Sequence, residues 1–141
     1  MTKSGIEDLT TLLATMKPSL DPETYVFITT TKPLSSLALP TLNPQLIAQE
    51  KEGTTIVTTE TLARSHGFTE ITFPCQKISL TIHSSLEAVG LIATITDRLK
   101  DFRISTNVVS GFFHDHIYVP VARAEEAMRV LEKLAEDSTR E

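Results

Sequence analysis

Polar residues that could bind a small anion follow residues 78–83, a stretch that alternates apolar and polar residues as a half-buried strand does. Ser84 and Glu87 come directly after it, at the spacing of a capping box at the start of a helix. The first turn of a helix presents free backbone amides and the positive end of the helix dipole, which together attract a carboxylate. The sequence therefore predicts an anion-binding junction at Ser84 and Ser85.

Two further residues could contribute to this junction. Gly90 is expected one turn inside the helix, where a glycine costs about 1 kcal/mol relative to alanine. Close approach of a neighbouring strand or of a ligand would explain it. Asn107, on an expected neighbouring strand, could offer its amide oxygen to an ammonium group or could be an ordinary hydrogen-bonded strand residue.

A second polar cluster is formed by His114, Asp115 and His116. On a strand the two histidines share one face and Asp115 takes the other, so the three side chains cannot all bind one metal ion without a bulge. Together with His83, the histidine pair could approach a zinc-type site. We favour a pair that faces a ligand or an interface, with Asp115 in a cap or a turn, and we expect no bound metal and no cofactor.

An enzyme would need a nucleophile, and the only arrangement available combines Ser85 or Cys75 with one of these histidines and Asp115. The chain has no G-x-S-x-G elbow, phosphate loop, dinucleotide glycine pattern or H-E-x-x-H sequence. Cys75 has no C-x-x-C partner and no neighbouring cation to activate it, so a packed thiol is expected. We therefore expect a protein without catalytic activity.

The elements that must position these residues can be read from periodicity. The second half of the chain predicts a strand, a helix from Leu86 towards Phe102, two strands joined at Ser110-Gly111, and a final amphipathic helix. The first half predicts a short helix with a capping box at Ser4, a strand, a proline-interrupted loop, a hairpin, a short helix capped at Thr58 or Thr59, and a strand. In the second half, the two strands are expected at 104–109 and 112–121 and the final helix at 123–136. In the first half, the short helix is expected at 6–16, the strand at 25–31, the loop at 32–44, the hairpin strands at 46–50 and 54–58, and the last strand at 68–73.

Both halves have roughly the βαββαβ order of a ferredoxin-like unit. We therefore expect an α+β protein of two tandem ferredoxin-like units, at residues 1–74 and 75–141, with a mostly antiparallel sheet and helices on one face. One set of apolar residues is expected to be buried together: Ile78, Leu80, Ile82, Val89, Leu99, Ile117, Val119, Met128 and Leu131.

Composition excludes several classes of partner. The 141 residues carry a net charge of −5 and no basic run, so neither nucleic acid nor an anionic membrane surface is an expected partner. The single cysteine, and the absence of a long apolar run or an export signal, lead us to expect a cytoplasmic protein.

Five runs of residues resemble the small two-copy ACT-domain proteins of unknown function, which are similar to the ACT modules of the CASTOR amino-acid sensors. The segment from Lys32 to Pro44 departs from the family pattern because it is longer. The runs are Tyr25-Val26-Phe27, Glu50-Lys51-Glu52-Gly53, His83 to Leu91, Asn107 to Gly111, and His114 to Val121.

This resemblance implies a pair of ACT-type units with a regulatory or ligand-sensing role, and an amino acid as the expected ligand. The carboxylate would meet the amides that begin the predicted helix, the ammonium group would meet an oxygen near Asn107, and the side chain would point towards Asp115 or the N-terminal unit. The candidate ligand-binding set is Ser84, Ser85, Leu86, Glu87, Val89, Gly90, Asn107, Val108, Asp115 and His116. A homodimer or a regulated protein is a possible further partner. The alternative is a protein-interaction module without a small ligand.

Overall fold

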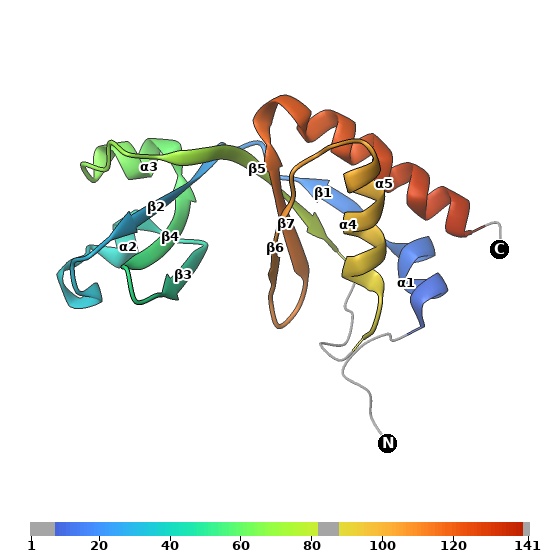
Figure 1. Ribbon diagram of the computed structural model, residues 1–141, viewed down its shortest axis with the longest axis horizontal. Coiled ribbons are helices and arrows are strands. Elements are labelled where there is room, and N and C mark those ends of the chain that lie inside the picture. The colour runs from blue at the N-terminus through green and yellow to red at the C-terminus, as the bar shows by residue number, and fades with distance from the viewer. Residues whose placement is uncertain (1–7, 82–87, 140–141) are drawn as a thin grey trace, which may run out of the picture. The chain divides into compact units, whose positions relative to one another are not determined.

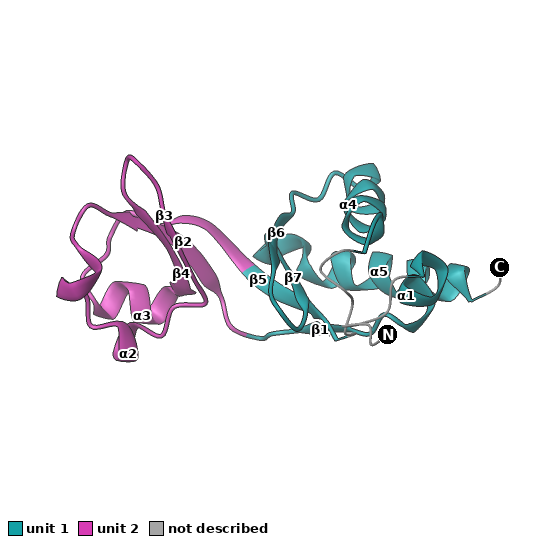
Figure 2. Cartoon of the chain, turned by 90° about the horizontal axis from the view of Figure 1, so that it is seen from below, with its two compact units in different colours: residues 1–22, 76–141 teal, residues 23–75 magenta. Residues whose placement is uncertain are grey.

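The computed structural model describes residues 8–81 and 88–139, and the chain forms two compact units (Figures 1 and 2). Residues 23–75 make up the central unit, and residues 1–22 with 76–141 make up the terminal unit. Among the described residues, no helix combines the length and the apolar character that a membrane span requires.

The central unit is a four-stranded antiparallel sheet in the order β3-β4-β2-β5, with its helices packed on one face (Figure 2). Its core joins Val26, Ile28 and Ile56 of the sheet to Leu42 and Ala63 of the helices. Its elements are β2 (Tyr25–Thr30), the 3-10 turn η1 (Leu34–Ser36), α2 (Leu39–Leu42), β3 (Leu46–Gln49), β4 (Thr54–Thr59), α3 (Glu60–Ser65) and the beginning of β5 (Thr72–Leu80).

The terminal unit has the strand order β1-β5-β7-β6, in which β1 is antiparallel to β5 and β6 is antiparallel to β7. Its elements are α1 (Leu9–Thr15), β1 (Pro18–Leu20), the end of β5, α4 (Leu91–Asp101), β6 (Asn107–Ser110), β7 (Asp115–Pro120), the 3-10 turn η2 (Val121–Arg123) and α5 (Ala124–Ser138). Both units thus have the split-βαβ arrangement, and the expected α+β ferredoxin-like fold is confirmed.

One long strand connects the two units. β5 is the last strand of the central sheet and the first strand of the terminal sheet, where the sequence predicted two separate strands, 68–73 and 78–83. The fourth strand of the terminal sheet is β1, which comes from before the central unit and pairs Pro18 with Leu80 and Leu20 with Ile78. Residues 8–22 therefore pack with the terminal unit, whereas the sequence analysis had grouped them with residues 23–74.

The core of the terminal unit contains most of the residues predicted to lie there. Met128 is partly buried against this core, and Ile82 lies outside the described residues. The prediction for Val89 is wrong, because its side chain is 84% exposed. The confirmed members are Ile78, Leu80, Leu99, Ile117, Val119 and Leu131.

The error at Val89 follows from the position of the helix start. α4 begins at Leu91, and Gly90 precedes it with φ +99°. Val89 and Gly90 were predicted to be helical, but both lie before the helix. A left-handed residue directly before a helix is a natural position for glycine, which has no Cβ to strain. The predicted capping box at Ser84 and Glu87 lies outside the described residues.

Two other predictions about the first half also change. Asp8 caps α1 by accepting a hydrogen bond from the Thr11 amide, whereas Ser4 lies outside the described residues. The proline-interrupted segment is ordered into η1 and α2, and the Thr58 hydroxyl donates to the Leu42 carbonyl across 2.6 Å in the core. This segment stands where a ferredoxin-like unit has its first helix.

Candidate functional site

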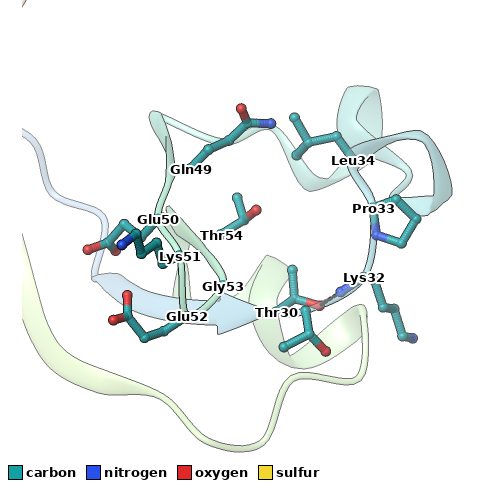
Figure 3. A pocket seen from close by; sticks show the side chains of 11 residues that line it. Thr30, Lys32, Pro33, Leu34, Gln49, Glu50, Lys51, Glu52, Gly53 and Thr54 are labelled. Carbon is teal, nitrogen blue, oxygen red and sulfur yellow. Dashed lines mark hydrogen bonds between the residues drawn. The ribbon is translucent and has the colours of Figure 1, made fainter.

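The central unit has an open polar hollow of about 350 Å³ where β2 runs into η1, opposite the β3–β4 hairpin (Figure 3). An amino acid or another small metabolite would fit a space of this size. One wall is the end of β2 with the turn that follows, and the other wall is the hairpin. The lining residues are Thr30, Thr31, Lys32, Pro33, Leu34, Gln49, Glu50, Lys51, Glu52, Gly53 and Thr54.

Hydrogen bonds within the chain fix both walls of the hollow. In the hairpin, Glu50 N donates to Gly53 O at 3.0 Å and Gly53 N donates to Glu50 O at 3.3 Å. In the other wall, the Lys32 amide donates to the Thr30 hydroxyl at 3.1 Å, which turns the chain away from the strand. The Thr55 hydroxyl also donates to the Glu50 carboxylate, so this carboxylate is held at the hairpin.

Gly53 brings the two walls together. A Cβ atom at this position would lie 2.9 Å from Thr29 Oγ1 and 3.1 Å from the Thr30 carbonyl oxygen. The first distance is shorter than real Cβ contacts and the second is tighter than most of them, so a larger residue would force the hairpin or β2 to shift.

The hollow offers neutral hydrogen-bonding groups inside and charges at its rim. Thr54 points into the space between the walls, whereas Lys32 extends away from it (Figure 3). Lys51 and Glu52 lie at the turn of the hairpin. A ligand with both an ammonium and a carboxylate group would meet both signs of charge at this rim.

The corresponding connection of the terminal unit is the predicted site. Ser84, Ser85, Leu86 and Glu87 lie outside the described residues. A Cβ atom on Gly90 would lie 3.3 Å from Leu9 Cδ2, so the close approach at this glycine is made by a side chain of α1. Neither a neighbouring strand nor a ligand, the two explanations suggested by the sequence, is needed for this contact.

The β6–β7 hairpin separates the other predicted ligand residues. Asn107 pairs with Tyr118, and Asp115 pairs with Ser110 at the other end of the hairpin. The two pairs are three residue steps apart along each strand, which is about 10 Å along the sheet. Val108 packs against the terminal core, whereas Asn107 is exposed, so strand alternation places neighbouring members of the predicted set on opposite faces.

His116 has a defined partner on the sheet. Its Nδ1 lies 2.8 Å from Ser79 Oγ in β5. Burial lowers the pKa of His116, electrostatic repulsion from Lys77 and from the His114 imidazole lowers this pKa further, and the Asp115 carboxylate opposes them. Asp115 itself is only 8% exposed. Within the part of the chain that the structure describes, no group of three or more His, Cys, Asp or Glu side chains could hold a metal ion.

Cys75 is a buried structural thiol. Its Sγ donates to the Tyr25 carbonyl at 3.4 Å, and burial raises the pKa of the thiol to about 12. At neutral pH the group is therefore protonated and does not provide the thiolate that a nucleophile requires. The other nucleophile considered from the sequence, Ser85, lies outside the described residues.

Sequence reasoning did not propose the residues of the hollow. Two signals pointed to it: the run Glu50 to Gly53 was among those that carry the family resemblance, and the central unit repeats the strand-to-helix order of the predicted site. The predicted site and the hollow thus occupy corresponding connections of the two units.

Sequence comparison finds the ACT domain twice in the chain, at residues 4–76 and at residues 73–133. No match was found among curated protein sequences.

Solved structures with the same fold include a Vibrio cholerae protein of unknown function described as a possible transport protein. It is 38% identical, with a TM-score of 0.77 over 86% of this chain and 91% of the other. The regulatory subunit of aspartate kinase from Thermus thermophilus, in its ligand-free form, is 12% identical, with a TM-score of 0.65 over 86% and 97%. The Escherichia coli aspartokinase III complex with aspartate and ADP is 14% identical, with a TM-score of 0.58 over 83% of this chain and 32% of the other.

Proposed function

This chain belongs to the ACT-domain family, and from that premise we propose that it is a regulatory protein that binds an amino acid and has no catalytic activity of its own. The observation that carries the proposal is the polar hollow between the end of β2 and the β3–β4 hairpin. It combines a volume suited to a small metabolite with neutral hydrogen-bonding groups and charges of both signs.

The binding mode follows from the chemistry of the two walls. A carboxylate would be held near Lys51 or by backbone amides of the turn after β2, and an ammonium group would be held near Glu52. The Thr54 hydroxyl can donate a hydrogen bond to the carboxylate or accept one from the ammonium group. We propose a second, corresponding site in the terminal unit, made by the predicted residues around Ser84 to Gly90 together with Asn107.

A regulatory role is in keeping with the proteins that share this fold. Two of the similar structures are a regulatory subunit of aspartate kinase and an aspartokinase bound to aspartate and ADP. Amino acids of this kind are therefore the first ligands to test. The protonated, buried thiol of Cys75 supports the proposal that the chain itself catalyses no reaction.

A second candidate function, a protein-interaction module, is favoured by one observation. The tip of the β6–β7 hairpin exposes two aromatic rings, Phe112 at 69% and Phe113 at 65%, and their centroids lie 5.0 Å apart in an edge-to-face arrangement. Exposed aromatic side chains of this size are common anchors of protein interfaces.

Thermal melting with a panel of amino acids distinguishes the two functions. A ligand at 100 times its Kd is expected to stabilise the protein by about 2.7 kcal/mol. For an interaction module, no amino acid should change the melting temperature. The variant Thr54→Val keeps the shape and the strand preference of threonine but removes the hydroxyl group from the hollow. Loss of one neutral hydrogen bond would weaken ligand binding roughly 2- to 12-fold.

A matched control is the same substitution at Thr10, an exposed position of α1 in the other unit. Thr10→Val should bind the ligand as the wild type does. If Thr54→Val and Thr10→Val bind with equal affinity while both remain folded, the ligand does not occupy the hollow of the central unit.

A further inference from the structure

The β6–β7 hairpin of the terminal unit (Figure 1) contains two histidines, His114 in the connection between the strands and His116 in β7. The connection is Gly111 to His114, closed by a hydrogen bond of 2.9 Å from the Gly111 amide to the His114 carbonyl. His114 and His116 stand two residues apart as the chain enters β7, so strand alternation places their side chains on the same face. Their ring centroids are 6.5 Å apart and the ring planes are nearly perpendicular, at 88°.

One imidazole nitrogen in this pair has no partner. Nδ1 of His114 is buried and makes no hydrogen bond. A buried polar atom without a partner costs about 1–3 kcal/mol, and native proteins rarely leave such an atom without a ligand, an ion or a water molecule. In the tautomer with the proton on Nε2, this Nδ1 has a free lone pair that suits a metal ion or a hydrogen-bond donor.

The other imidazole is oriented in the way that metal-binding histidines are. Nδ1 of His116 is paired with Ser79 Oγ at 2.8 Å, which fixes the ring and leaves Nε2 for a second contact. Gly111 lies beside that nitrogen, since a Cβ at residue 111 would be 3.7 Å from it, an ordinary contact distance. The same Cβ would lie 3.0 Å from the His114 carbonyl oxygen, so a larger residue would also strain the turn.

We propose that His114 and His116 form a binding site for one divalent transition-metal ion of the kind that prefers imidazole, such as Zn²⁺ or Ni²⁺. With metal–nitrogen bonds of about 2.0–2.1 Å and a tetrahedral angle, two bound imidazoles have centroids about 5 Å apart. The observed 6.5 Å is close enough for small side-chain rotations to complete the site. Water or a second copy of the chain would supply the remaining ligands. The site is independent of the amino-acid hollow.

Calorimetric titration of the full chain, freed of metal by a chelator, with Zn²⁺ and then with Ni²⁺ tests the proposal. The wild type should bind one ion per chain. His114→Ala should weaken binding at least tenfold, and so should His116→Gln, which can keep a hydrogen bond to Ser79 but offers no imidazole. Ser79→Ala should weaken binding about 10-fold, because it removes the partner that orients His116.

The matched control is His66→Ala, which removes a histidine of the central unit and should leave the affinity unchanged. Circular dichroism of every variant checks that it is folded. Equal affinity of the wild type, His114→Ala and His116→Gln would overturn the proposal, and so would the absence of binding to the wild type. Sedimentation of the loaded protein then shows whether a second copy completes the coordination.

Discussion

Replacement of Gly53 by alanine tests whether close packing of the β3–β4 hairpin against β2 shapes the hollow. The new Cβ would lie 2.9 Å from Thr29 Oγ1 and 3.1 Å from the Thr30 carbonyl oxygen. The exposed Thr29 side chain can rotate away. The Thr30 backbone is held by pairing with Thr54 in β4, so the hairpin must move instead.

The expected cost follows from two opposing effects. Forcing an extra carbon atom into a packed site costs about 1–3 kcal/mol. Replacing glycine by alanine also restricts the unfolded chain, which stabilises the folded state by about 0.4–1 kcal/mol. We therefore expect Gly53→Ala to lower the free energy of unfolding by about 1–2 kcal/mol. Urea denaturation followed by circular dichroism measures this change, because the chain has no tryptophan to report by fluorescence.

Gly67→Ala is the control for this experiment. Gly67 has φ +88°, and a Cβ there would meet nothing within 4 Å, so alanine adds backbone strain without a collision. Both variants should lose stability, but only Gly53→Ala should shift the amide resonances of the hairpin and the end of β2 and weaken binding of a ligand in the hollow. A Gly53→Ala protein with wild-type stability and unchanged hairpin resonances would refute the packing argument.

Three further predictions concern the rest of the molecule. Cys75 should resist a thiol reagent such as Ellman's reagent at pH 8 in the native protein and react only in denaturant, because it is buried with a pKa of about 12; fast labelling of the folded protein would contradict its placement. Val89→Ser should change the free energy of unfolding by less than about 0.5 kcal/mol, whereas Ile95→Ala in the core should cost about 2–5 kcal/mol in the same urea assay. The pKa of His116 is lowered in the folded state, whereas in the unfolded chain it is the ordinary histidine value of about 6.5. Below that pH the unfolded chain therefore binds more protons than the folded protein, so the wild type should lose stability as the pH falls below about 6.5. His116→Gln should lose less over the same pH range in urea titrations, and identical slopes would argue against the lowered pKa.

Periodicity predicted the elements whose apolar face is continuous. Ile78 and Leu80 alternate along β5, and Leu131 lies on the apolar face of α5, so simple burial rules were sufficient. The fold class could be predicted because the order of these elements is that of two ferredoxin-like units.

Long-range pairing was much harder to predict. β1 has only 3 residues, too few for a recognisable alternation, and its partner β5 lies far along the chain. Nothing local shows that residues 18–20 pair with residues 78–80. For the same reason the role of Leu9 beside Gly90 could not be inferred, because that contact depends on how α1 packs.

The start of α4 shows a conflict between two local signals. Val89 fits the helical spacing of the residues that follow it, but Gly90 adopts φ +99° and the helix begins only at Leu91. Spacing alone cannot distinguish an apolar residue in the first turn from an exposed one just before it. The hollow was missed for a different reason, since it is formed by two turns whose residue types are common in ordinary loops.

The most direct test of amino-acid binding is a set of ¹H–¹⁵N correlation spectra of the labelled protein, recorded as each amino acid is added. We expect at least one amino acid to shift, in a saturable way, the amide resonances of residues 30–32, residue 34 and residues 49–54 of the central unit. If the terminal site is also occupied, residues 88–90 and Asn107 should shift as well. Spectra unchanged by every amino acid, or saturable shifts confined to other surfaces, would contradict the claim that this ACT-domain protein senses an amino acid at its strand-to-helix connections.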